Sequence, residues 1–324
     1  MKIRLSILLV TLAALLALPI RAVDVSNYGI LLLAHGGGPD WNKRIEELVH
    51  TLDASAPADV AFGMAQRSEI QAAVTRLEGR GVGAVIVVPL FVSSHSSVIS
   101  ATEYLLGVRD EAPPELARFA SMKHGHGAHG AHENASVDPS ALLPVTSEVP
   151  IRWCSPLNDA RVVSEILLTR IRSVSTDPTN EVVIVVAHGP VSDEENARWL
   201  NDMKTIVGRL DPAGAFHRTE YLTVRDDAPE PIRSEATAEL RAKVSAAGID
   251  GKRALVVPLL VSHDGIERGI RKRLEGLEYV MPSNGLVPDP RIAEWVLETA
   301  KNATEAAIVR TDAQTDDNNH GASR

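Results

Sequence analysis

The sequence predicts an α/β protein with two similar lobes, each built on a parallel sheet and related by internal duplication. Aromatic residues make up only 4% of the 324 residues, so Val, Leu, Ile and Ala must form the core, as in buried parallel strands. Short apolar runs bounded by Gly and Pro alternate with stretches of helical periodicity. Two sequence elements also occur once in each half of the chain, in the same order, which indicates a duplication.

The repeated elements are two apolar runs that each lead to a histidine. The first element reads LLLAHGG at residues 31–37 and IVVAHGP at 184–190. The second reads VIVVPLFVSSHSS at 85–97 and ALVVPLLVSHDGI at 254–266. Both halves therefore share the order of apolar run, His-Gly, helices, apolar run and histidine.

Each half predicts four strands that alternate with four helices. In the first half we expect strands near 29–34, 58–63, 83–92 and 148–153, and helices near 40–53, 68–79, 96–106 and 157–172. In the second half we expect strands near 181–187, 215–222, 253–261 and 276–281, and helices near 192–208, 230–247, 264–274 and 290–303. Continuous Val, Ile and Leu runs are typical of parallel strands that helices cover on both faces.

The limits of the lobes follow from changes in composition. The N-terminal lobe is expected at 24–175 and the C-terminal lobe at 179–305, with a polar, turn-rich linker between their last and first elements. A long insertion at about 107–147 has no partner in the second half. The polar residues 306–324 are expected to form a disordered tail.

Residues 1–22 predict a signal peptide. Lys2 and Arg4 precede the apolar run Leu5–Ile20, and the small residue Ala22 stands at a plausible cleavage site. The alternative is an uncleaved membrane anchor, for which a run of about 16 residues is short. We therefore expect an exported, periplasmic protein with no stable membrane insertion after cleavage.

Charge and cysteine content exclude several classes of function. The formal net charge of -9 argues against a nucleic-acid partner, because phosphate contacts need clustered Lys and Arg. The single cysteine, Cys154, excludes an intrachain disulfide, a Cys-based zinc site and an iron–sulfur cluster. Any metal would therefore be held by histidine or carboxylate side chains.

Four histidines follow strands at equivalent places in the two halves. His35 and His188 each end the first strand of a lobe, and His95 and His263 each follow the third strand. In open α/β sheets ligands bind beyond the carboxyl ends of the strands. Neutral imidazole is a common ligand of divalent metals, so each pair is expected to meet over one ion. The alternative is that each histidine only caps a turn.

These motifs resemble the CbiX/SirB-type sirohydrochlorin chelatases, the class II chelatases, in their long two-domain form with a His-rich insertion. The resemblance rests on LLLAHGG and VVPLFVSSH in the first half and on their second copies. It implies two flavodoxin-like lobes around a cleft, and insertion of Co²⁺, Fe²⁺ or Ni²⁺ as substrate into a tetrapyrrole, with no organic cofactor. It also implies that His35 and His95 are catalytic, and that His35, His95, His188 and His263 bind the metal.

The chain departs from the family pattern in two ways. The family places its second histidine about eight residues beyond the proline of the second motif, whereas His95 lies six beyond Pro89 and His263 five beyond Pro258. The family also normally works in the cytosol, whereas this chain begins with a signal peptide. An exported metal or tetrapyrrole carrier without catalysis is therefore the alternative function, and a histidine-dependent phosphatase is a weaker one, because no Arg stands beside His-Gly.

Other residues are candidates for auxiliary roles. A tetrapyrrole substrate carries carboxylates, so Arg67 and Arg225, which follow the second strand of each half, are candidates for binding it, against a role as solvated loop residues. The insertion contains four histidines that could bind further metal, at His124, His126, His129 and His132. Because the insertion joins a helix to a strand, its ends are expected on the face opposite the site. We expect a monomer or a weak dimer.

Overall fold

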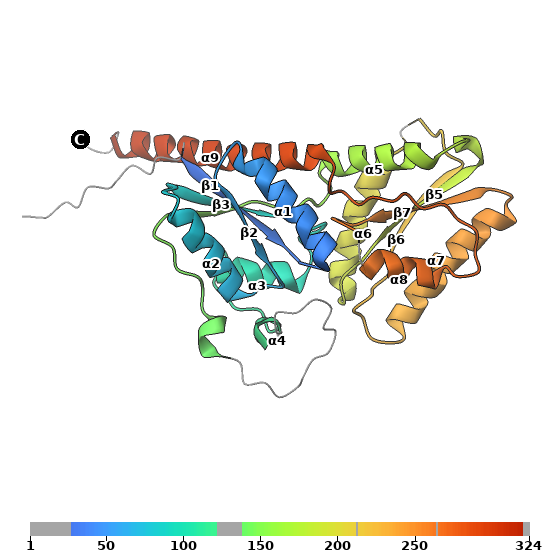
Figure 1. Cartoon of the computed structure of the whole chain (residues 1–324), viewed down its shortest axis with the longest axis horizontal. Helices are drawn as coiled ribbons and strands as arrows, with labels where there is room; N and C mark the ends of the chain where they lie inside the picture. The colour runs from blue at the N-terminus through green and yellow to red at the C-terminus, as the bar shows by residue number, and fades with distance from the viewer. Residues whose placement is uncertain (1–26, 122–137, 212, 264, 320–324) are drawn as a thin grey trace, which may run out of the picture.

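Two parallel sheets form the framework of the molecule (Figure 1). The computed structural model describes residues 27–121, 138–211, 213–263 and 265–319, with side chains up to residue 305. Sheet A has the order β2-β1-β3-β4, with β1 Tyr28–Ala34, β2 Ala58–Phe62, β3 Ala84–Pro89 and β4 Ile151–Trp153. Sheet B has the order β6-β5-β7, with β5 Glu181–Ala187, β6 Arg218–Thr223 and β7 Arg253–Leu259. The predicted α/β class with two parallel sheets is confirmed.

In both sheets the first strand of the lobe lies at the centre, between the second and the third. All seven residues of β5 and six of the seven of β1 are buried, because helices cover both faces of these strands. The predicted strand at 276–281 is reduced to a single bridge between Leu255 and Val280. Pro282 follows at once and has no backbone N–H with which to extend the ladder.

The helices agree with the predicted ones to within a few residues at their starts. In the N-terminal half they are α1 Pro39–Asp53, α2 Arg67–Glu78, α3 Ser97–Leu105, α4 Leu116–Ser121, the short helix η1 Pro139–Leu142 and α5 Arg161–Val174. In the C-terminal half they are η2 Pro178–Asn180, α6 Asp193–Gly208, α7 Ile232–Ile249, α8 Gly265–Arg273 and α9 Pro290–Asn319. None of the helices in the described ranges is long and apolar enough to cross a membrane.

The last helix of each half packs on the other lobe. In Figure 1, α9 lies along the N-terminal strands, where it contacts β3 and α1, and α5 lies over the C-terminal lobe, where it contacts β7 and α6. The predicted limits of 24–175 and 179–305 therefore divide the sequence but not the packing. Helical periodicity predicts an apolar face, but it does not say which sheet that face will cover.

A continuous hydrophobic core joins the two lobes. It contains Ile30 and Leu32 of β1 together with Val183 and Val185 of β5, and the exchanged helices contribute to it from both sides. Two further clusters lie on the outer faces, one in each lobe. Because α5 packs on the C-terminal lobe and α9 packs on the N-terminal lobe, each sheet is covered on one face by a helix from the other half of the chain.

The segment of the insertion that leads to β4 lies along α2 and is hydrogen-bonded to it. The Nε of Arg67 donates to the carbonyl of Leu143 at 2.9 Å, and Ser147 donates to Glu78 at the other end of the helix. Arg67 follows the carboxyl end of β2, so this segment begins on the site's side of the sheet. The insertion ends at Ser147, beside the last residue of α2 and away from the site, so the expectation that its ends lie on the opposite face agrees with this end, although the segment passes the site's side at Leu143. His124, His126, His129 and His132 lie outside the described residues.

The predicted disordered tail is also corrected. Helix α9 continues through residues 306–319, so only residues 320–324 lie outside the described part of this segment. The sequence from Ala303 to Asn319 contains no Gly or Pro and has several alanines, the residue with the highest helix propensity. A polar composition was therefore not sufficient to predict disorder here.

Candidate functional site

His35 and His188 stand at the carboxyl ends of the two central strands and influence each other electrostatically. His35 is exposed and follows β1, whereas His188 is partly buried and follows β5. The charge of His35 lowers the pKa of His188, so the two side chains lie within electrostatic range of each other although they belong to different lobes. The Nδ1 of His35 lies 2.8 Å from the carbonyl oxygen of Gly36, which leaves Nε2 as the nitrogen with the lone pair.

A carboxylate faces His188. The Nε2 of His188 lies 3.4 Å from Oδ2 of Asp227, in the loop after β6. Burial lowers the pKa of His188 below its usual 6.5, and the charges of Asp227 and Asp226 oppose this by raising it. The imidazole is therefore neutral at pH 7, and a carboxylate stands ready to stabilise its protonated form.

His95 contacts the opposite lobe. It follows β3, and its Nε2 lies 3.5 Å from Oδ2 of Asp202 on α6. Burial raises the pKa of Asp202, and the charge of His95 lowers it. Glu195, two turns earlier on the same face of α6, also has a pKa raised by burial. His95 is thus directed at a pair of carboxylates from the C-terminal lobe.

His263 makes the corresponding connection in the other direction. Its Nδ1 lies 3.2 Å from Oε2 of Glu267 on α8, and burial lowers its pKa. The Nη1 of Arg44, on α1 of the N-terminal lobe, donates to the carbonyl of His263 at 3.3 Å and to the hydroxyl of Ser262 at 3.2 Å. The second histidine of each lobe is therefore part of the contact between lobes.

The four histidines are not joined with further side chains into a complete metal site in the described residues. No three His, Cys, Asp or Glu side chains in the described ranges are placed to hold a metal ion together. The structure instead brings together the first histidines of both lobes and gives the second ones partners of their own. The meeting of His35 with His95, and of His188 with His263, over one ion stays a prediction.

The two arginines proposed to bind substrate are used within the protein. Arg67 holds the insertion, as described above. Arg225 is only 6% exposed, and its guanidinium contacts the carbonyls of Pro190 and Val191 and the carboxylate of Asp193. These contacts occupy Nε and Nη2, so most of the donors of Arg225 serve the protein itself, and direct binding of a substrate carboxylate by this residue stays a prediction.

Three other residues were missed by the sequence analysis. Asp227 follows β6 in the segment VRDDAP, and a carboxylate just beyond the strand next to His188 was a usable signal. Asp202 and Arg44 lie on helices α6 and α1, and no local pattern indicated that these helices meet the other lobe.

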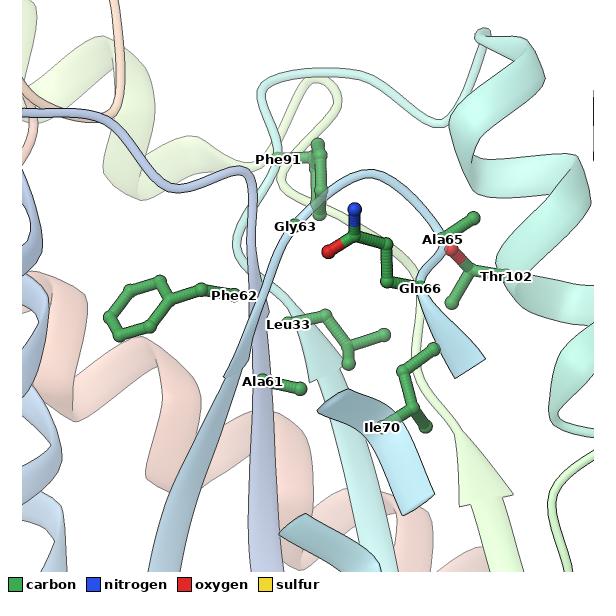
Figure 2. Close-up of a pocket in the computed structure, with 9 residues that line it drawn as sticks. All are labelled: Leu33, Ala61, Phe62, Gly63, Ala65, Gln66, Ile70, Phe91 and Thr102. Atoms are coloured by element: carbon green, nitrogen blue, oxygen red, sulfur yellow. The ribbon is translucent and has the colours of Figure 1, made fainter. Parts of the chain in front are cut away.

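Two cavities among the described residues do not suit a tetrapyrrole with carboxylate groups. One lies below the loop after β2, among Leu33, Gln66, Phe91 and Thr102 (Figure 2), and its volume of about 10 Å³ holds no more than a water molecule. The other is a groove of about 590 Å³ along the edge of β6, between α6 and α7. Its charged lining residues are four carboxylates and two cations, namely Asp193, Glu220, Glu235, Glu239, Arg225 and Lys243.

We expect Asp227→Asn to lower the pKa of His188 further. The substitution removes the carboxylate that raises this pKa and leaves the burial that lowers it. Titration of the His188 ring by NMR measures the change. Asp250→Asn, at the far end of the same lobe, is the matched control and should have no effect on the ring. An unchanged or higher pKa in Asp227→Asn would contradict the contact seen here.

Comparison with known proteins supports the family predicted from the motifs. Residues 29–174 match the family model CbiX. The structure is similar to SirB from Bacillus subtilis with Fe³⁺, with a TM-score of 0.54, 16% identity, and coverage of 86% of this chain and 96% of that chain. It is also similar to the sirohydrochlorin chelatase SirB from Bacillus subtilis subspecies spizizenii in complex with cobalt, with a TM-score of 0.53 and the same identity and coverage. At this identity the two likenesses show the fold. No curated protein matches the chain.

Proposed function

We propose, on the basis that residues 29–174 belong to the CbiX family, that this protein inserts a divalent metal into a sirohydrochlorin-like tetrapyrrole. The observation that carries the proposal is the approach of His35 and His188 from the two lobes, with Asp227 beside the second. Co²⁺ and Fe²⁺ are the metals that we favour, because imidazole suits both ions.

The reaction exchanges two protons for one metal ion. Two pyrrole N–H groups of the macrocycle each lose a proton, and the divalent ion binds the four nitrogens. His188 is neutral at pH 7, so its lone pair can meet the incoming ion and, once the ion passes to the macrocycle, accept one proton; Asp227 at 3.4 Å stabilises the imidazolium that results. The exposed His35 presents the metal through its Nε2, and the second proton passes to His35 or to solvent as the ion leaves it.

The test is an absorption assay. Purified mature protein is mixed with sirohydrochlorin and Co²⁺ or Fe²⁺, and the change of the tetrapyrrole spectrum is followed against the spontaneous reaction. Insertion faster than the spontaneous rate supports the enzyme. Binding of metal or tetrapyrrole without any gain in rate supports the alternative, an exported carrier, which the signal peptide favours.

The same proposal includes export to the periplasm. Residues 1–22 carry the pattern of a signal peptide but lie outside the described residues. Cell fractionation followed by N-terminal sequencing tests it: we expect periplasmic protein whose chain begins directly after the signal peptide. Full-length protein in the cytosol would refute export without affecting the proposed reaction.

A further inference from the structure

Arg225 is a buried cation that joins the end of β6 to the loop after β5. Its backbone N–H donates to the carbonyl of His188 at 2.8 Å. Its Nε donates to the carbonyl of Pro190 at 2.7 Å, and its Nη2 donates to the carbonyl of Val191 and pairs with Oδ1 of Asp193 at 2.9 Å. One residue therefore contacts four positions of the six-residue loop that begins at His188 and ends at Asp193.

The backbone on both sides of this contact is held in an uncommon conformation. Arg225 has a φ of 50°, a region that favours glycine, and Gly189 has a φ of 73°. A Cβ on Gly189 would lie 2.4 Å from the Cβ of Thr223, so the loop is pressed against the end of β6. A residue with a long side chain remains at 225 despite the backbone strain, and the contacts of its guanidinium compensate for that strain.

Both members of the His188–Asp227 pair depend on Arg225. The carbonyl of His188 accepts from the backbone N–H of Arg225, so the guanidinium acts on His188 only through the rest of the loop, and Asp227 follows Arg225 by two residues in the same turn. Asp226, between them, is fastened separately by an ion pair with Arg273 of α8. The separation of 3.4 Å between the imidazole and the carboxylate is thus set by a backbone segment whose position Arg225 fixes.

The N-terminal lobe has no such arrangement. The loop after β2 also contains a residue with positive φ, Ala65, but an alanine cannot reach the loop that follows His35. That loop is fastened from α1 instead, where the side-chain oxygen of Asn42 accepts from the N–H of Gly37 at 2.8 Å. The histidine of this lobe is exposed, whereas its counterpart His188 is partly buried.

We propose that Arg225 is a positioning residue for the metal-handling histidine of the C-terminal lobe. It holds the loop of residues 188–193 so that the imidazole of His188 stays against Asp227 and turns its ring to an incoming divalent ion. The inference rests on the proposed function, since it takes a divalent metal as the species that meets His188. It replaces the substrate-binding role that the sequence suggested for the same residue.

The experiment compares Arg225→Gln and Arg225→Lys with Arg170→Gln in the full mature chain. Arg170 is also a largely buried cation, but its partner is Asp289 and it contacts no residue of the loop. Three quantities are measured: amide hydrogen exchange in residues 188–193, the affinity for Co²⁺ alone, and the affinity for sirohydrochlorin alone. Loss of a residue that orients a ligand weakens metal affinity by about 10–100-fold.

We expect faster exchange in the loop and about 10–100-fold weaker Co²⁺ binding in Arg225→Gln, with unchanged sirohydrochlorin binding. Arg225→Lys keeps the charge near Asp193 and should show a smaller loss, and it remains informative if the Gln variant does not fold. Arg170→Gln should change none of the three quantities.

Two results overturn the inference. If Arg225→Gln weakens sirohydrochlorin binding and leaves the Co²⁺ affinity unchanged, Arg225 binds the substrate instead. If hydrogen exchange in the loop becomes faster and the Co²⁺ affinity is unchanged, the position of the loop does not affect metal binding. Because neither measurement uses turnover, a wild-type protein that binds Co²⁺ but does not insert it refutes the proposed function alone.

Discussion

A chain that stops after Asp289 should lose the structure of its N-terminal lobe, although the deleted helix follows the C-terminal lobe in sequence. Helix α9 packs on β3 and α1, and it buries Ile292, Val296 and Ala300 completely against them. Burial of one Ile or Val side chain stabilises by about 1.5–3 kcal/mol, and the deletion also exposes the apolar face of sheet A. The loss is comparable to the whole stability of a domain, which is about 5–15 kcal/mol.

Hydrogen exchange followed by mass spectrometry distinguishes the two lobes in this experiment. We expect β1 and β3 to lose protection while β5 and β7 keep more of theirs, because α5 still covers sheet B. A chain that stops after Glu305 is the matched control, because it keeps every α9 residue named above. Loss of protection in sheet B with sheet A intact would contradict the exchange of helices.

His188→Ala should abolish most of the metal insertion, and His35→Ala should do so independently. Positioned acid–base groups contribute about 10²–10⁴-fold to rate, so we expect a fall of at least about 100-fold in kcat/KM for His188→Ala. His35 is exposed, so its replacement should act mainly through the apparent affinity for the metal. His188→Ala therefore removes the proton acceptor together with a metal contact, whereas His35→Ala removes chiefly a metal contact.

The pH dependence of the wild-type rate also tests the role of His188. Because burial lowers the pKa of His188, the neutral form persists below pH 6.5, and the acid limb of the rate profile should lie below that value. His217→Ala is the matched control, since His217 is exposed and lies at the amino end of β6, away from the site. A rate unchanged in both His35→Ala and His188→Ala would exclude the proposed mechanism.

Local sequence patterns were sufficient to predict the strands and the histidines that follow their carboxyl ends. The predicted runs at 29–34 and 181–187 became β1 and β5, because runs of consecutive apolar residues such as those at 30–34 and 182–187 are stable only in the middle of a covered sheet. The histidines that end these strands were found in the same way, since a residue that follows a central parallel strand must lie at its carboxyl edge.

Local patterns could not predict contacts between residues that are distant in sequence, and the candidate site depends on such contacts. Asp202 meets His95 from a helix more than one hundred positions along the chain, and Arg44 meets His263 across an even larger separation. Arg225 was selected for its charge, but its burial beneath the loop after β5 makes it part of the framework. The packing of α5 and α9 on opposite lobes could not be predicted for the same reason, because the sequence of an amphipathic helix does not specify which sheet the helix covers.

The amino-acid sequence by itself determined the two parallel sheets and the histidines at their carboxyl edges, because both follow from periodicity and strand direction, which are properties of short segments. Only the tertiary structure decided which charged groups face those histidines and which lobe each terminal helix completes. Those outcomes depend on burial and charge between distant segments, whose energies are set by the packed arrangement of both lobes together.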